Sequence, residues 1–250
     1  MTAKYWVGID IGGTFTDMFA IDKDGKVYTT KSSSTPKEPE KAVIECLRKA
    51  SIKGSEIEMF FLGTTVVVNA IVTGRGAKTG LITTHGFRDV LEIRRAHRLA
   101  DPLNLYNIQQ ELPRPLAPRR WRMEVAERML SDGRVLIPLD EEGLKKVVGE
   151  LKKQGVESIA VSFIFSFVNP QHEKRAIEIV RKEYPEAYSC SSIEIIPVIR
   201  EYERVSTTVA SAFTGPIVNS HMATIMDGLK RIGYPRDYFL VMTSSGGVMT

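Results

Sequence analysis

Apolar and polar positions in the first third of the chain alternate in short runs that are typical of strands. The runs at 5–10, 14–21 and 27–31 are separated by a Gly-Gly pair and by the turn sequence Asp-Lys-Asp-Gly, so they predict a three-stranded meander. Pro39 suits the first position of a helix, and apolar residues recur after it at helical spacing. The further elements expected in this third are a strand at 59–62, a helix through Asn69 and Ile71, and a strand at 79–83.

Beyond residue 122, helices and strands are expected to alternate. A continuous apolar run at 158–165 predicts a strand that is buried on both faces of a sheet. Asp140 and the pair Asn169-Pro170 are suitable helix starts. The remaining expected elements are a hairpin at 125–130 and 135–137, helices after Asp140 and after Pro170, strands at 188–193 and 238–242, and a long helix at 200–231. Because the sequence stops just after a Ser-Ser-Gly-Gly turn, we expect it to be cut before the end of a domain.

Segment 94–122 interrupts this pattern. It contains four prolines, and its seven arginines against two acids give it a charge of +5, whereas the whole chain carries +4. The prolines favour a connector or an insertion, so we expect a division into residues 1–95, 96–122 and 123–250. The arginines indicate either a solvated or subunit-facing surface or a site for an anion, to which His97 could contribute. Aromatic residues are not interleaved with them, and we expect no nucleic-acid partner.

The overall composition excludes several classes of protein. With 43% hydrophobic and 26% charged residues, the chain is not of the disordered type. Its two cysteines, Cys46 and Cys190, provide neither a disulfide framework nor a metal-binding spacing. No apolar run approaches the roughly 20 residues of a membrane span, and no leader sequence is evident. We therefore expect a cytoplasmic protein without a membrane partner.

The residues that carry candidate chemistry lie in the first predicted hairpin. A strand delivers Asp10 to its end, and Gly12 and Gly13 then form a tight turn whose backbone amides phosphate oxygens can approach. Thr14 and Thr16 add hydroxyl donors. Asp10 and Asp17 are acidic and cannot bind phosphate, so we expect them to hold Mg²⁺ directly or through water. The hairpin is thus interpreted as a metal–nucleotide site.

Further polar candidates are scattered along the chain. Thr64, Thr65 and Asn69 follow a strand at the start of a helix, where they could face an anionic ligand or simply cap the helix. Glu201 and Arg204, three residues apart on the long helix, could form a local ion pair or belong to a site. We expect His172 to be an exposed residue of a helix's first turn. Ser191 and Ser192 beside Cys190 do not indicate a covalent nucleophile, because no Gly-x-Ser-x-Gly elbow occurs.

The segment Asp-Ile-Gly-Gly-Thr-Phe-Thr-Asp at 10–17 resembles the first phosphate loop of actin-like ATPases. The closer resemblance is to the hydantoinase A/5-oxoprolinase family. Matching blocks are spread over nearly the whole chain, at 63–70, 79–90, 165–170, 200–204 and 244–247.

This resemblance implies an α/β fold. Residues 1–95 would form an RNase H-like lobe that binds phosphate. Further α/β structure would follow at 123–250 and lead into a truncated second lobe, so the whole would be an incomplete two-lobed clamp.

The resemblance also implies an enzyme that uses ATP and Mg²⁺ to open a cyclic amide, by phosphorylating the ring carbonyl oxygen. The same family includes subunits of acetone and acetophenone carboxylases, so a ketone substrate is the alternative. A second subunit of the hydantoinase B type, and hence a hetero-oligomer, would fit either reaction. The catalytic residues are not assigned.

One departure from the family pattern bears on activity. Only one Asp-x-Gly-Gly-Thr loop occurs, whereas the family has a second in its later lobe. We therefore expect the isolated chain to bind nucleotide weakly and to turn over nothing. A sugar kinase and a non-enzymatic nucleotide-binding module remain alternative interpretations of the hairpin.

Overall fold

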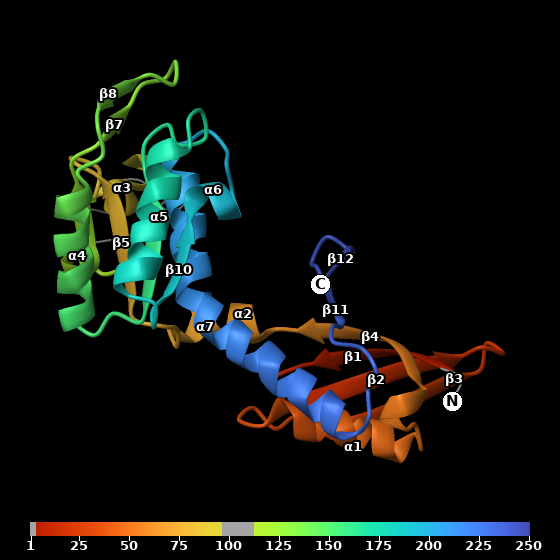
Figure 1. Cartoon of the computed structure of the whole chain (residues 1–250). Helices are drawn as coiled ribbons and strands as arrows, with labels where there is room; N and C mark the ends of the chain where they lie inside the picture. Colours follow the sequence, from red (N-terminus) through yellow and green to blue (C-terminus); the bar gives the residue numbers. More distant parts are fainter. Residues whose placement is uncertain (1–3, 97–112) are drawn as a thin grey trace, which may run out of the picture. The chain divides into compact units, whose positions relative to one another are not determined.

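A computed structural model describes residues 4–96 and 113–250 of the protein, and it contains two compact units (Figure 1). Unit 1 consists of Met1–Val72 and Ile217–Thr250, and unit 2 of Thr73–Pro216. Helix α7 (Glu201–Arg231) contributes its first half to unit 2 and its second half to unit 1. This division differs from the three segments expected from the sequence, because the C-terminal stretch returns to the first sheet. Much of the expected connector, 97–112, lies outside the described residues.

Unit 1 is built on a six-stranded sheet in the order β12-β11-β4-β1-β2-β3. The strands are β1 (Tyr5–Ile11), β2 (Phe15–Asp22), β3 (Val27–Ser33), β4 (Ile57–Thr64), β11 (Leu240–Met242) and β12 (Val248–Met249). The helices are α1 (Pro39–Lys49), the 3₁₀ turn η1 (Gly54–Glu56), α2 (Val66–Thr73) and the second half of α7. Strands β1 to β3 form the antiparallel meander predicted from the sequence, and β4 runs parallel to β1.

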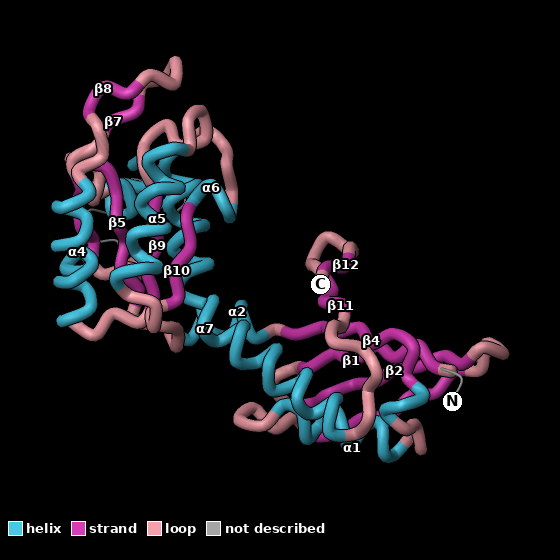
Figure 2. Tube along the Cα trace, viewed as in Figure 1, coloured by secondary structure: helices cyan, strands magenta, loops and turns pink. Residues whose placement is uncertain are grey.

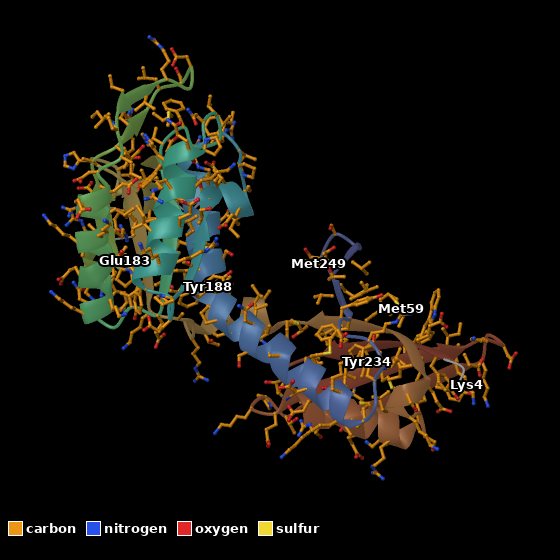
Figure 3. The ribbon with its side chains drawn as sticks, viewed as in Figure 1. Lys4, Met59, Glu183, Tyr188, Tyr234 and Met249 are labelled. Carbon is orange, nitrogen blue, oxygen red and sulfur yellow. The ribbon has the colours of Figure 1, made fainter. Side chains whose placement is uncertain are left out.

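The two faces of this sheet differ. Alternate residues of β1 and β4, such as Val7, Ile9 and Phe60, are buried beneath α1 and the second half of α7. Tyr234 packs against Phe60 on that side, with ring centroids 6.3 Å apart. Met59 precedes Phe60 in β4, so its side chain projects from the other face; Figure 3 labels Tyr234 and Met59. The face opposite the helices is open among the described residues, and Trp6 is 53% exposed there.

Unit 2 is built on a four-stranded parallel sheet in the order β10-β9-β5-β6 (Figure 2). Its strands are β5 (Thr79–Thr84), β6 (Arg122–Val125), β9 (Ser158–Ser162) and β10 (Tyr188–Ser191), and a separate ladder joins β7 (Arg128–Met129) and β8 (Val135–Ile137). Its helices are α3 (Val90–Ile93), η2 (Arg94–Ala96), η4 (Arg119–Trp121), α4 (Glu141–Lys153), α5 (Gln171–Glu183), α6 (Ser192–Ile195) and the first half of α7. Helices α4 and α5 pack on one face of the sheet, and α3 and α7 pack on the other.

Two expected elements of unit 2 are corrected by the structure. Val125 does not begin a hairpin but ends β6, which pairs with β5, so the hairpin strand starts only at Arg128. The strand expected at 188–193 ends at Ser191, because Ser191 and Glu194 form a capping box that starts α6. Among the described residues, no helix combines the length and the apolar character that crossing a bilayer requires.

Candidate functional site

Strand register gathers the expected site residues at one end of the sheet in unit 1. Antiparallel pairing of β1 with β2 places Asp10 opposite Asp17. Parallel pairing of β1 with β4 places Gly63 beside Asp10 and Thr64 beside Ile11. The hairpin tip and the end of β4 therefore meet at the same edge, although about 50 residues separate them in the sequence.

The hairpin tip exposes backbone donors. The amide of Gly12 donates to Phe15 O at 3.0 Å, whereas the amides of Gly13 and Thr14 donate no hydrogen bond within the described chain. Neither Gly12 nor Gly13 adopts a positive φ, although the sequence predicted a turn that uses this ability of glycine. Gly12 is required instead by space, because an added Cβ would lie 3.0 Å from Phe15 O. The two free amides and the exposed Thr14 hydroxyl are suited to an anion.

Asp10 is the carboxylate available beside these donors. Asp10 is exposed, and none of the described residues forms a hydrogen bond or an ion pair with its carboxylate. Its carboxylate lies against Gly63, where an added Cβ would be 3.0 Å from Asp10 Oδ1. Asp17 instead pairs with Lys31, whose Nζ lies 2.8 Å from Asp17 Oδ1 and above the Phe15 ring.

The carboxylates of Asp10 and Asp17 fit a magnesium ion that arrives with a nucleotide. Such ions bind one or two carboxylates together with phosphate and several waters, whereas a dedicated protein cage uses more ligands. No group of three or more His, Cys, Asp or Glu side chains suited to a metal occurs in the described part of the chain. The Asp10 carboxylate is free for this role, whereas Asp17 would have to share its carboxylate between the ion and Lys31.

Thr16 lies differently from the other hairpin residues. Its side chain is fully buried on the core face, and its hydroxyl contacts Ser34 Oγ at 3.0 Å, a position that does not suit a direct phosphate contact. Ser34 also donates to Gly12 O at 2.8 Å, and its amide donates to Thr14 O at 2.9 Å. Ser34 was not among the residues expected at the site. The available signal in the sequence was the polar run at 32–37 that follows the meander.

The residues after β4 act as local caps in this structure. Thr64 Oγ1 accepts from the amide of Val66 at 3.3 Å and lies 3.4 Å from His221 Nε2, whose pKa is lowered by burial. Asn69 Nδ2 donates to Thr65 Oγ1 at 3.1 Å. Thr64, Thr65 and Asn69 thus lie at the same edge as the hairpin, and the capping interpretation has direct contacts in its favour.

A cavity of about 770 Å³ lies over the open face of the sheet in unit 1. Asp10, Asp17 and Lys31 contribute its charged lining, and Phe19 and Phe61 are among its apolar walls. Because cross-strand pairs place Asp17 between Asp10 and Lys31, the three charges form one row across β1, β2 and β3. The volume of the cavity falls within the roughly 300–1,000 Å³ that is usual for small-molecule sites.

In unit 2, the expectation that His172 is exposed is wrong. It is 8% exposed, and its Nδ1 lies 2.9 Å from Glu127 Oε2, while the Thr84 hydroxyl donates to the other Glu127 oxygen. The helix α5 begins one residue earlier, and its first turn packs against the loop that carries Glu127, which buries the ring. His172 therefore ties α5 to the ends of β5 and β6.

Arg204 also differs from expectation, because its guanidinium makes no hydrogen bond with Glu201. It is 1% exposed and donates to Phe163 O at 2.5 Å and to Val198 O at 3.2 Å. Burial lowers the pKa of Arg204, and the charges of Glu173 and Glu201 oppose this shift. Ser192 donates to Glu173 at 2.8 Å, and burial raises the pKa of Glu173 to about 7 although three groups donate hydrogen bonds to it. Burial also raises the pKa of Cys190 to about 12.

Three of the described arginines in the basic segment pair with acids. Arg119 donates twice to Asp89, at 2.8 and 3.0 Å, and the buried Arg122 donates to Glu92 at 2.7 Å. Arg95 pairs with Glu203 at 2.9 Å. Arg94 donates instead to Pro113 O, and Arg120 lies over the Trp121 ring, so neither of these two is paired with a described acid. His97 lies outside the described residues.

Comparison with known proteins assigns this fold. Residues 6–184 match the model of the hydantoinase/oxoprolinase N-terminal region. The chain is 35% identical over 255 residues to caprolactamase subunit alpha of Pseudomonas jessenii, an alignment that covers 98% of this chain and 36% of that protein. The crystal structure of ATP-dependent caprolactamase from the same organism matches with a TM-score of 0.86 at 32% identity, over 97% of this chain and 36% of that one. A nucleotide-free structure of acetone carboxylase, from a study of ATP-dependent acetone carboxylation, matches with a TM-score of 0.88 at 27% identity, over 98% and 37%.

The likeness covers nearly all of the 250 residues but only a portion of each relative. The chain spans 36% of the length of caprolactamase subunit alpha and 21% of the length of 5-oxoprolinase 1 of Arabidopsis thaliana. The expected α/β fold, an RNase H-like lobe of the actin-like type followed by further α/β structure, is confirmed by the two structural matches. The protein belongs to the hydantoinase/oxoprolinase family and comprises that family's N-terminal region.

Proposed function

We propose that this chain is the nucleotide-binding region of an ATP-dependent enzyme that opens cyclic amides. The observation that carries the proposal is the hairpin tip of unit 1, where free amides of Gly13 and Thr14 adjoin the unpaired carboxylate of Asp10. Amides that point outward from a tight turn attract phosphate oxygens, and a carboxylate beside them suits the magnesium ion that accompanies a nucleotide. Family membership supports the reaction class.

The residues of the hairpin would then have separate roles. Gly13 and Thr14 would hold the phosphates through their free amides and the Thr14 hydroxyl, and Asp10 would hold Mg²⁺ through water. Gly12 would shape the turn, because its own amide donates to Phe15 O. Asp17 would support the water shell of the metal while it stays paired with Lys31. When bound, ATP would supply the phosphoryl group that is transferred to the ring carbonyl oxygen and makes the carbonyl carbon more electrophilic toward water. Positioning and charge stabilisation are what such transfers require of the protein.

The second candidate function is a subunit of an ATP-dependent carboxylase that acts on a ketone. The match to acetone carboxylase favours it, and both reactions activate an oxygen with ATP. Because the relative in Pseudomonas jessenii is named as a subunit, we also propose a second subunit of the hydantoinase B type and hence a hetero-oligomer. A cytoplasmic location belongs to the proposal, and the two buried free cysteines agree with a reducing compartment.

Calorimetric titration of Mg-ATP into the 250-residue chain tests the nucleotide site. Asp10→Ala should lower the affinity at least about tenfold, which is about 1.4 kcal/mol. Asp24→Ala is the matched control, because Asp24 is an exposed aspartate in the turn between β2 and β3, at the other end of β2 from the hairpin tip. Equal affinities in all three proteins would refute the assignment. We expect weak binding and no substrate-dependent phosphate release from this chain alone, since no second phosphate loop occurs in it.

A further inference from the structure

The parallel sheet of unit 2 has a point where ligands are commonly bound. Its first strand in sequence, β5, is central, the next strand β6 lies on one side, and β9 and β10 follow on the other side. The connection that leaves the carboxyl end of β5 thus goes to one side, toward β6, and the connection that leaves the neighbouring β9 goes to the other side, toward β10. Doubly wound folds with the order 2-1-3-4 have the same arrangement. Ligands of such sheets bind in the crevice outside the carboxyl ends of the strands at this point.

A cavity of about 250 Å³ lies beside the loop that follows β5. Its walls come from two segments more than 100 residues apart: Phe87, Val90 and Ile93 around α3, and Tyr202 in the first turn of α7. The volume is below the roughly 300–1,000 Å³ of sites for drug-sized ligands, so it suits a small ring better than a nucleotide.

The backbone around this cavity is held in an unusual conformation. Arg94, Arg95 and Arg200 have φ of 45°, 56° and 78°, in the left-handed region that residues other than glycine rarely adopt. They lie directly next to the two lining segments. Such conformations persist where surrounding contacts impose them, and they are concentrated at ligand sites and switch regions.

Two polar groups of the cavity are already engaged. Gly86 donates its amide to Glu124 at 2.9 Å, and the Asp89 carboxylate accepts two hydrogen bonds from Arg119. Arg95 and Glu201 retain free capacity. Arg95 uses one nitrogen on Glu203, at 2.9 Å, and a guanidinium carries five N–H donors. Glu201 is exposed and accepts no hydrogen bond from any of the described residues.

A free donor and a free acceptor beside apolar side chains suit the organic substrate of the proposed function. A cyclic secondary amide presents a carbonyl oxygen and an N–H next to each other on an apolar ring. Arg95 would donate to the carbonyl, Glu201 would accept from the N–H, and the aromatic and aliphatic side chains would cover the ring. A ketone has no N–H for Glu201, so it would lose one of the two polar contacts.

We propose that this cavity binds the ring of a cyclic amide, with Glu201 as the residue that selects an amide over a ketone. The proposal rests on the proposed function, because it names the site of that function's organic substrate. The sequence left two roles open for Glu201, an ion pair with Arg204 or a place in a site. Because the Arg204 guanidinium donates to backbone carbonyls instead, the proposal gives Glu201 the second role.

The test is an NMR titration of the ¹⁵N-labelled 250-residue chain with ε-caprolactam and with N-methylcaprolactam, which lacks the N–H. The variants are Glu201→Ala and, as a matched control, Glu183→Ala, an exposed glutamate at the last position of α5 in the same unit (Figure 3). Caprolactam should shift the amides of Gly86 and Tyr202. Glu201→Ala should lower its affinity about tenfold, as for the loss of a hydrogen bond to a charged group, and should change that of N-methylcaprolactam less than about twofold. Glu183→Ala should change neither.

Three results would overturn the proposal: no shift up to the solubility limit, shifts confined to unit 1, or equal weakening of both lactams by Glu201→Ala. Mg-ATP calorimetry on the same samples keeps the two proposals apart. If Asp10→Ala weakens nucleotide binding while caprolactam fails, only the lactam site is refuted. If caprolactam binds as expected while Asp10→Ala has no effect, the nucleotide site is refuted and the ring-amide site stands.

Discussion

Replacing Ser34 by alanine should destabilise unit 1, although Ser34 lies just beyond the end of β3. The substitution removes the hydroxyl that donates to Gly12 O and leaves the Thr16 hydroxyl, which is 0% exposed, without its partner. A buried polar group left unpaired costs about 1–3 kcal/mol, whereas water can reach Gly12 and replace that bond. We therefore expect Ser34→Ala to lower the free energy of unfolding by about 2 kcal/mol.

Urea unfolding monitored by the fluorescence of Trp6, in a Trp121→Phe background, would report on unit 1 alone. Ser33→Ala is the control, because Ser33 is exposed and has no described partner, and it should change the free energy by less than about 0.5 kcal/mol. Adding Thr16→Val to Ser34→Ala should recover about 1 kcal/mol, since both polar partners are then absent. If Ser34→Ala unfolds at the same urea concentration as Ser33→Ala, the reasoning about the buried hydroxyl is refuted.

Three further predictions rest on the described contacts. Burial raises the pKa of Glu173 to about 7 from 4.5, so the folded state favours the protonated carboxyl. The free energy of unfolding should therefore fall by up to about 3 kcal/mol as the pH rises from about 4.5 to 7. Urea titrations at several pH values measure this dependence, and Glu173→Gln should abolish it. Gly63→Ala places a Cβ 3.0 Å from Asp10 Oδ1 and should lower Mg-ATP affinity about threefold or more in calorimetry, whereas Gly149→Ala, where a Cβ meets nothing within 4 Å, should not. Cys190, 3% exposed and with a pKa of about 12, should react with a thiol reagent at neutral pH only after unfolding in urea, and rapid labelling of the native chain would contradict its burial.

The sequence predicted the meander of unit 1 because its signals are local. Alternation of apolar residues, the Gly-Gly pair and Pro39 each act within a few residues, and β1, β2, β3 and α1 form where those signals lie. The placement of Asp10 at the end of β1, opposite Asp17, follows from the same hairpin register.

The rest depended on contacts between distant segments. Thr16 carries a polar side chain, but strand alternation places it on the core face, where Ser34 satisfies it. His172 is buried because Glu127, 45 residues earlier, provides its partner. The return of the C-terminal strand β11 to β4 pairs Leu240 with Phe61, and no local pattern specifies that pairing.

The central claim is that nucleotide phosphate binds the free amides of the hairpin tip. The most direct measurement is an NMR titration of the ¹⁵N-labelled chain with Mg²⁺ alone and then with Mg-ATP, following every backbone amide. The account predicts that Mg-ATP, and not Mg²⁺ alone, produces its largest shifts at Gly13 and Thr14, and that Asp10→Ala reduces them at equal nucleotide concentration. Saturable binding of Mg-ATP that leaves both amides unshifted while other amides move would contradict the account.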